Sequence, residues 1–344
     1  MSGPLLKVED LRVSFETEDG NVQAVDGVSF DVSPGEVVAI VGESGCGKSV
    51  TAMSLMGLTR DRNATITGTA NLEGTDLITA DDGELRRLRG DDIAMIFQDP
   101  MTSLNPVYRI GDQISEQIKA HRDISDDEAH EQAVELLEQV GIPGAAQRAS
   151  SYPHEFSGGM RQRAMIAMGL SLEPRILIAD EPTTALDVTI QAQILRLLRE
   201  LNRERGLAVI LITHDLGVVA EIADRVLVMY AGEIVEKGTL DEIFYAPQHP
   251  YTWGLLGSVM RMDRPGRERL SQIKGQPPSL ANPPEGCKFR PRCPHAFSKC
   301  TEHPDLAERG GAPGQLDRCW LSGEQKKSLR VLETGDIGLE APAA

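Results

Sequence analysis

The 344-residue sequence contains no apolar run near the roughly 20 residues that a membrane-spanning helix needs. Its opening, MSGPLLKVEDLRVSF, lacks the basic flank and apolar core of a secretory signal. Positive charge is also scarce, since 35 Lys and Arg face 52 Asp and Glu and leave a net charge of −17. Such a surface repels nucleic acids and anionic lipid headgroups. We therefore expect a cytosolic protein that does not bind nucleic acid and reaches a membrane only through a partner.

Cysteine is rare and unevenly placed. The chain has five cysteines, and four of them (Cys287, Cys293, Cys300 and Cys319) fall in its last sixth. In a reducing cytosol such a group is expected to bind a metal rather than to form disulfides. The fifth, Cys46, is interpreted as a small residue tolerated in a loop.

The overall composition is that of a soluble globular protein. Hydrophobic residues make up 40% and charged residues 25% of the chain, so it can bury a core. The length suits one large domain plus an appendage.

A glycine-rich loop indicates phosphate binding. The apolar run at 37–41 predicts a buried strand, and the pattern Gly42-x4-Gly47-Lys48-Ser49 follows it and leads into a helical run. Glycines let the backbone amides turn toward phosphate oxygens, and the helix N-terminus adds partial positive charge. Lys48 is expected to reach the β- and γ-phosphates, and the Ser49 hydroxyl to ligate Mg²⁺.

An acidic pair follows a second predicted strand, at 176–179. Asp180 is suited to hold the Mg²⁺ shell. Glu181, beside it, can polarise an attacking water. Alone, this pair could be an ordinary solvated strand end. Together with the glycine-rich loop, it predicts nucleoside triphosphate hydrolysis.

A third stretch, FSGGMRQR, places Ser157, Gly158 and Gly159 at the start of a strongly helical run. The free amides and the helix dipole there form a second candidate anion site. An isolated tripeptide of this kind is more often a plain N-cap and turn.

These motifs, in this order, resemble the ATP-binding-cassette (ABC) ATPases over about residues 5–250. FSGGMRQR matches the family's signature, although Phe156 replaces the commoner Leu and Met160 the usual Gln. MIFQDP places Gln98 at the family's Q-loop, TALD places Asp187 at its D-loop, and LAVILITHD places His214 at its H-loop.

The resemblance implies a role for each matching residue. Phe15 stacks on adenine, and Gly42, Ser44, Gly45 and Gly47 belong to the phosphate loop. Gln98 contacts Mg²⁺ and the attacking water, and His214 contacts the γ-phosphate.

The resemblance also implies a head-to-tail dimer. Each ATP lies between the Lys48 loop of one subunit and the Ser157 helix start of the other. The second ATPase subunit is expected to be a paralogue, which makes a heterodimer.

Residues of about 99–172 are predicted to be largely helical, because IGDQISEQIKAHRD and DDEAHEQAVELLEQVGI carry apolar residues at helical spacing. The resemblance implies that they form the family's helical subdomain. In the family, a groove there receives a short helix from a permease. Two transmembrane permease subunits are therefore expected, with an external solute-binding protein as an indirect partner, and the chain is expected at the cytoplasmic face of the membrane.

EFSGGMRQR, HPYTWGLL and PPEGCKFRPRCPHAFSKC together resemble the oligopeptide/dipeptide branch of ABC importers. The predicted fold is α/β, a P-loop ABC nucleotide-binding domain with a mainly parallel core sheet, a small antiparallel sheet and a helical subdomain. This domain is predicted over 1–258, an irregular cysteine-containing domain over 259–322, and a disordered tail over 323–344.

The cysteine spacings x5, x6 and x18 lack the tight pair that structural zinc sites use. They favour a 4Fe–4S cluster held by four thiolates, as some members of the branch have. Zinc, with His295 as another possible ligand, and plain buried thiols stay open.

The prediction is thus an ATPase subunit that binds ATP and Mg²⁺ and powers the uptake of peptides, or of a related small solute, through an ABC importer. The alternative is a non-transport ABC ATPase acting on DNA or ribosomes, which the absence of a basic patch disfavours.

Overall fold

The computed structural model describes residues 3–18, 20–99, 103–184, 186–258 and 273–334. The chain divides into two compact units. The first contains the start of the chain up to Leu6, Val32–Val37 and Leu72–Ile212. The second contains Lys7–Asp31, Val38–Asn71 and the chain from Thr213 onward.

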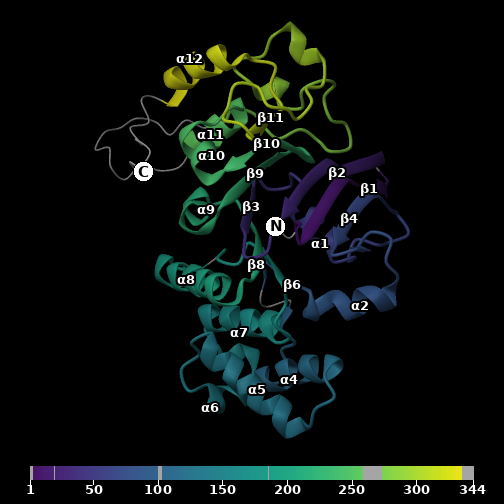
Figure 1. Cartoon of the computed structure of the whole chain (residues 1–344), viewed down its shortest axis with the longest axis vertical. Helices are drawn as coiled ribbons and strands as arrows, with labels where there is room; N and C mark the ends of the chain where they lie inside the picture. Colours follow the sequence, from purple (N-terminus) through teal and green to yellow (C-terminus); the bar gives the residue numbers. More distant parts are fainter. Residues whose placement is uncertain (1–2, 19, 100–102, 185, 259–272, 335–344) are drawn as a thin grey trace. The chain divides into compact units, whose positions relative to one another are not determined.

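The first unit carries three parallel strands and the helices between α2 and α8 (Figure 1). Its strands are β5 (Thr75–Asp76), β6 (Ile93–Ile96), β7 (Ile176–Asp180) and β8 (Ala208–Thr213), whose last residue belongs to the other unit. Its helices are α2 (Asp82–Asp91), α4 (Ile110–His121), α5 (Asp126–Gln139), α6 (Ala145–Ala149), η1 (Pro153–Glu155), α7 (Gly158–Leu170) and α8 (Val188–Arg205).

Parallel pairing aligns the ends of the core strands in this unit. β6 pairs with β7 and β7 with β8, and every residue of β7 and β8 is buried. Strands buried on both faces read as continuous apolar runs, which is why they could be recognised in the sequence. Gln98 follows β6 and Glu181 follows β7, so parallel pairing brings both residues to the same edge.

The predicted helical subdomain consists of α4, α5, α6 and α7, which pack against one another (Figure 1). Its apolar contacts come from buried residues at helical spacing, such as Ile114 and Ile118 of α4. Ser125 caps α5, because its side chain and that of Glu128 accept each other's backbone N–H groups. The predicted helices at this place are therefore confirmed.

The second unit carries strands of two sheets. Its strands are β1 (Leu6–Thr17), β2 (Gly20–Val32), β3 (Val37–Val41), β4 (Ala64–Leu72), β9 (Arg225–Tyr230), β10 (Glu233–Thr239) and β11 (Leu316–Asp317). One terminal residue of each of β1 to β4 belongs to the first unit. Its helices are α1 (Lys48–Leu55), α9 (Leu216–Ile222), α10 (Leu240–Tyr245), α11 (Pro250–Ser258), η2 (Arg290–Arg292), η3 (Ser298–Thr301) and α12 (Gly323–Thr334).

In one sheet β2, β1 and β4 are neighbours, and in the other β3 pairs in parallel with β9. β10 then continues antiparallel to β9, and β11 antiparallel to β10. The last strand comes from the cysteine-containing region, with Asp317 opposite Glu236. The predicted α/β class with a mainly parallel core sheet and a separate N-terminal sheet is confirmed.

The C-terminal region differs from the expectation in one respect. A disordered tail was predicted from residue 323, whereas helix α12 begins at Gly323 and packs against α11. Lys326 of this helix is buried and its ammonium lies 2.7 Å from the equally buried Asp317 carboxylate. A polar sequence conceals this contact, because the buried group is a charge rather than an apolar side chain. Residues 259–272 and 335–344, which belong to the predicted C-terminal domain and tail, lie outside the described residues.

Candidate nucleotide site

The acidic pair of the first unit lies at the end of β7. Asp180 is the last residue of this strand and is 4% exposed. Glu181 follows in a left-handed backbone conformation (φ 47°), which is uncommon for a residue other than glycine, and its N–H donates to the carbonyl of Ile212 at 2.8 Å. This sharp turn lets the chain leave the sheet with the Glu181 carboxylate at its edge. Backbone strain of this kind concentrates at functional sites.

Two side chains hold the Glu181 carboxylate. Gln98 Nε2 donates to Glu181 Oε2 at 2.8 Å, and Thr184 Oγ1 donates to the same oxygen at 2.8 Å. The predicted site residues Gln98 and Glu181 are thus brought together from positions 83 residues apart. Thr184 was not predicted. Its place three residues after Glu181, in the TTALD stretch, is the local signal that could have identified it.

Ser157 and Asp187 begin the two helices that follow the sheet in this unit. Ser157 Oγ accepts the N–H of Met160 at 3.3 Å and caps α7, and Asp187 Oδ1 accepts the N–H of Ile190 at 3.0 Å and caps α8. Both side chains are also exposed. A Cβ atom on Gly159 would lie 2.8 Å from Ile190, so glycine allows α7 to approach α8 closely. The plain N-cap role considered for Ser157 is therefore present, and it leaves the first amides of α7 open to an external anion.

The phosphate loop of the second unit runs from β3 to α1 with close backbone packing. At Gly42 (φ 156°) a Cβ atom would lie 2.1 Å from the carbonyl of Met229, and at Gly47 (φ 106°) it would lie 2.3 Å from the carbonyl of Ala24. Only glycine can occupy these two positions without moving the backbone behind the loop. Ser44 and Gly45, between them, are exposed, so the loop turns its free side outward.

Lys48 is folded onto this loop. It is 5% exposed, and its ammonium donates to the carbonyls of Gly42 at 2.8 Å and Glu43 at 3.0 Å. Ser49 follows it in the first turn of α1. Burial raises the pKa of the Cys46 thiol, so this loop residue is a protonated, packed thiol. The loop therefore has the lysine and backbone N–H donors that a nucleoside triphosphate requires, and a hydroxyl oxygen that can ligate Mg²⁺.

Phe15 and His214 are the two other predicted residues of this unit. Phe15 lies near the end of β1 and is partly buried. His214 directly follows β8 and is exposed. Both are accessible to a ligand.

The four clustered cysteines line one small cavity of about 10 Å³, with Phe289, Trp320 and Leu321 among its walls. All four thiols are free, and the Cys287 N–H donates to the Cys300 carbonyl at 3.0 Å. Burial raises the pKa of Cys293 and of Cys319 to about 12.

Within the described part of the chain no three His, Cys, Asp or Glu side chains are arranged to hold a metal ion. The predicted convergence of the thiols is thus present, whereas the predicted ligand geometry is not. Thiolates are soft ligands of the kind that iron–sulfur clusters and zinc prefer, so the chemistry of the four cysteines fits such a group. Their arrangement in space, as described, does not.

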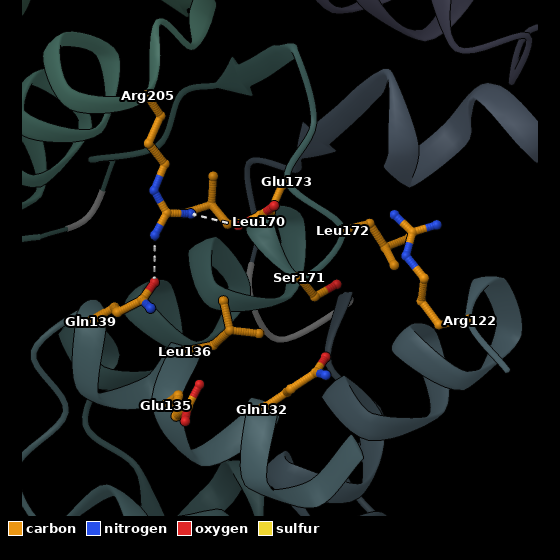
Figure 2. Close-up of a pocket in the computed structure, with 10 residues that line it drawn as sticks. All are labelled: Arg122, Gln132, Glu135, Leu136, Gln139, Leu170, Ser171, Leu172, Glu173 and Arg205. Atoms are coloured by element: carbon orange, nitrogen blue, oxygen red, sulfur yellow. Dashed lines mark hydrogen bonds and ion pairs between the residues drawn. The ribbon is translucent and has the colours of Figure 1, made fainter. Parts of the chain in front are cut away.

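A further pocket of about 340 Å³ lies in the first unit, between α5, the end of α7 and the end of α8 (Figure 2). Arg205 reaches across it, donating to Gln139 Oε1 at 2.9 Å and lying 3.7 Å from the Glu173 carboxylate. Glu173 precedes β7 and Asp180 ends that strand. This pocket therefore lies at the opposite end of β7 from the acidic pair and is separate from the nucleotide chemistry.

Two family models match the chain. The model described as "ABC transporter" matches residues 25–184, and the model described as "Oligopeptide/dipeptide transporter, C-terminal region" matches residues 235–300. Among curated relatives, the dipeptide transport ATP-binding protein DppD of Bacillus subtilis is 54% identical over 96% of this chain and 98% of its own length. The oligopeptide transport ATP-binding protein OppD of Salmonella typhimurium is 53% identical over 93% of this chain and 95% of its own length.

Solved structures agree with these matches. The dimeric post-hydrolysis state of the ATP-binding cassette MJ0796, bound to ADP and Pi, has a TM-score of 0.62 and 29% identity, and the match covers 68% of this chain and 98% of that one. The cbiO1 protein of Clostridium perfringens, part of the ABC transporter complex cbiONQ, has a TM-score of 0.60 and 29% identity, with 71% and 92% covered.

Proposed function

Since this chain belongs to the ABC transporter family, in its oligopeptide/dipeptide branch, we propose that it is the ATP-hydrolysing subunit that powers peptide uptake through a membrane importer. The observation that carries this proposal is identity above 50%, over nearly the whole length, to two peptide-transport ATP-binding proteins. The alternative of a non-transport ATPase acting on DNA or ribosomes is not favoured by these relatives.

We further propose how the residues share the reaction. The loop of Gly42, Ser44, Gly45 and Gly47 surrounds the phosphates. Lys48 leaves its two carbonyl partners and binds the β- and γ-phosphates, which offer it full negative charge instead of carbonyl dipoles.

Different residues are proposed to bind the metal ion and to orient the attacking water. Ser49, Asp180 and Gln98 hold Mg²⁺ or its water shell, and Glu181 polarises the attacking water. The hydrogen bond between Gln98 and Glu181 supports this assignment, because it places the proposed Mg²⁺ contact next to the residue proposed to polarise the water. His214 contacts the γ-phosphate, and Phe15 stacks on the adenine.

A second subunit completes each site. Ser157, Gly158 and Gly159 of one subunit would contact the ATP held by the Lys48 loop of the other, with Asp187 nearby in the same interface. The exposed, anion-ready start of α7 supports this assignment. A paralogue is proposed as the partner, which gives a heterodimer.

The segment between β6 and α4 is the proposed docking site for the permease subunits. Phe97, Val107 and Tyr108 are large apolar side chains with 38%, 71% and 55% of their surface exposed. Exposed apolar groups that lie together in one segment are typical of interaction sites. Phe97 directly precedes Gln98 in the sequence, so a partner that binds there would act next to a proposed catalytic residue.

No helix in the described ranges is long and apolar enough to cross a bilayer. Attachment to the cytoplasmic face of the membrane, through the permeases, is therefore part of the proposal. An external binding protein would supply the solute on the far side.

The four clustered cysteines are proposed to hold a metal group, a 4Fe–4S cluster with zinc as the alternative. Their convergence on one cavity supports this. To bind the group, the four thiols would have to ionise and move closer together than they lie in the described structure. When bound, the group would tie together a region with little regular structure.

The test of the main proposal is reconstitution with the permease pair and binding protein encoded beside the gene. The complex in proteoliposomes should hydrolyse ATP faster when peptide is present and should accumulate labelled peptide only with ATP. ATP hydrolysis that responds to DNA or ribosomes and ignores peptide would contradict the proposal.

A further inference from the structure

The segment between Cys287 and Cys293, in the second unit, contacts the phosphate loop directly. Arg292 Nη1 lies 2.5 Å from Glu43 Oε2, and Nη2 lies 2.9 Å from Oε1. Glu43 is the second residue of the loop, directly after Gly42. A two-point pair between guanidinium and carboxylate fixes direction as well as distance. The Arg292 side chain is 5% exposed and the Glu43 side chain 27% exposed, so water reaches this pair from the Glu43 side only in part.

Other contacts fix Arg292 itself. Its guanidinium also donates to Tyr230 Oη at 3.4 Å and lies 5.8 Å from the centre of that ring. Its Nε donates to the carbonyl of Lys274 at 3.2 Å. The arginine is therefore held in place independently of the loop, and it can act as an anchor.

Glu43 is bound at three points. Its side chain meets Arg292, its N–H donates to the hydroxyl of Tyr251 at 2.9 Å, and its carbonyl accepts from Lys48 at 3.0 Å. Tyr251 is fully buried, in helix α11. The residue that carries the Arg292 bond thus also contacts the lysine that binds phosphate.

The same cysteine segment supports the loop from behind. Lys288, 7% exposed, donates to the carbonyl of Ala231 at 3.1 Å. The next residue, Gly232, donates its N–H to the carbonyl of Cys46 at 2.9 Å. Two routes therefore connect the C-terminal region with the loop.

We propose that Arg292 and Tyr251 are positioning residues for ATP binding, which hold Glu43 and so keep the phosphate loop in its binding conformation. The C-terminal region is then part of the nucleotide site and not a separate appendage. Two physical effects act together. The anchored loop loses little conformational freedom when it binds the nucleotide, and Arg292 neutralises a carboxylate that would otherwise repel the phosphates.

The test compares ATP affinity and steady-state kinetics in the full chain and its assembled transporter. Arg292→Ala should raise the Kd and the KM for ATP about tenfold, the cost of ordering roughly one residue on binding, while kcat stays within about twofold. Arg292→Lys, which keeps the charge without the two-point geometry, should give an intermediate increase. Tyr251→Phe, which loses only the hydroxyl, should also raise KM and spare kcat.

Arg290→Ala is the matched control, because Arg290 lies in the same short helix η2 and its guanidinium is not part of the Glu43 contact. This variant should leave KM unchanged. A double-mutant cycle gives the sharper result: because Glu43→Gln removes both the pair and the repulsive charge, adding Arg292→Ala to it should change KM little.

Additive effects in that cycle would overturn the proposal, and so would an Arg292→Ala protein with an unchanged melting temperature and an unchanged KM. If Arg292→Ala does not fold, Arg292→Lys decides in the same way. A selective loss of kcat would also contradict a positioning role at the binding step.

Discussion

Gln98 Nε2 donates a hydrogen bond to Glu181 Oε2 across 2.8 Å, which joins the second residue after β6 to the first residue after β7. The bond connects the proposed water-polarising carboxylate to the segment that carries the exposed Phe97, Val107 and Tyr108. A partner that moves this segment would move the Gln98 amide and leave Glu181 with Thr184 as its other donor. If the proposed docking site is correct, this hydrogen bond offers a path between a membrane partner and hydrolysis.

This path predicts that the exposed apolar segment serves transport more than hydrolysis. Val107→Asp and Tyr108→Asp place a charge where an apolar partner surface would pack. They should reduce peptide uptake and peptide-stimulated ATPase activity at least tenfold, while basal ATPase activity of the purified chain stays within about twofold. Leu58→Asp, at a 48% exposed apolar residue of the other unit, is the control and should transport normally. Normal uptake by both segment variants would exclude this docking site.

Ser157 caps α7 and has a proposed second role toward the partner's nucleotide, and substitutions should separate the two roles. Asp is as good an N-cap as Ser, so Ser157→Asp should leave the unfolding free energy unchanged, whereas Ser157→Ala should lower it by about 1 kcal/mol. The added carboxylate, however, repels a phosphate, so Ser157→Asp should abolish most ATPase activity. Ser125→Asp, at the N-cap of α5, is the matched control and should keep full activity. Activity retained in Ser157→Asp would show that α7 does not meet a nucleotide.

The buried His249 predicts a loss of stability in acid. Burial lowers its pKa to about 3 from an ordinary value of 6.5, so folding holds it neutral. The contribution of neutral His249 to the free energy of unfolding is fully present above pH 6.5. It is lost as the pH falls toward 3, because the unfolded chain binds the proton first.

His249→Asn can keep an acceptor for the Tyr251 N–H, which His249 Nδ1 accepts at 3.1 Å, and cannot titrate. Between pH 6 and 4 the unfolding free energy of the natural chain should fall more steeply than that of the variant, by up to about 1.4 kcal/mol per pH unit. Glu236, with a pKa raised by burial to about 7, is the same in both proteins and cancels in the comparison. Urea unfolding at several pH values measures the difference, and parallel curves would contradict it.

The sequence predicted the parts of the site that depend on short, local patterns. Lys48, Asp180 and Glu181 follow runs of buried apolar residues, and the chemistry of each could be argued from its neighbours. The Arg292–Glu43 pair could not be predicted, because its partners are 249 residues apart and Glu43 occupies a position that the phosphate-loop pattern leaves unspecified. The left-handed turn at Glu181 was equally hidden, since its residue type gives no sign of it.

In the C-terminal region, too, local patterns could be recognised in the sequence and contacts between distant residues could not. Its cysteines were recognised by their spacing, and the structure brings them to one cavity. Helix α12 was missed because its buried contact is an ion pair between Lys326 and Asp317, and neither residue stands out from a polar tail. Pairing across distant elements is a property of the fold and not of a local pattern.

The proposed metal group predicts a specific stoichiometry. Chain purified without oxygen should be brown and contain about four iron and four sulfide per chain. Cys293→Ser should lose the iron and lower the melting temperature, whereas Cys46→Ser should keep the iron. One zinc per chain without iron would replace the cluster by its alternative, and protein free of both metals would refute the metal proposal.

The most direct test of the central claim is ATP turnover by Glu181→Gln in the assembled transporter. Glutamine can keep a hydrogen bond with Thr184 or Gln98 but cannot take up a proton from water. We predict that this variant binds ATP with near-normal affinity, hydrolyses it at least a hundredfold more slowly, and accumulates as a closed dimer with ATP bound. Near-normal hydrolysis by Glu181→Gln, with ATP binding intact, would contradict the account.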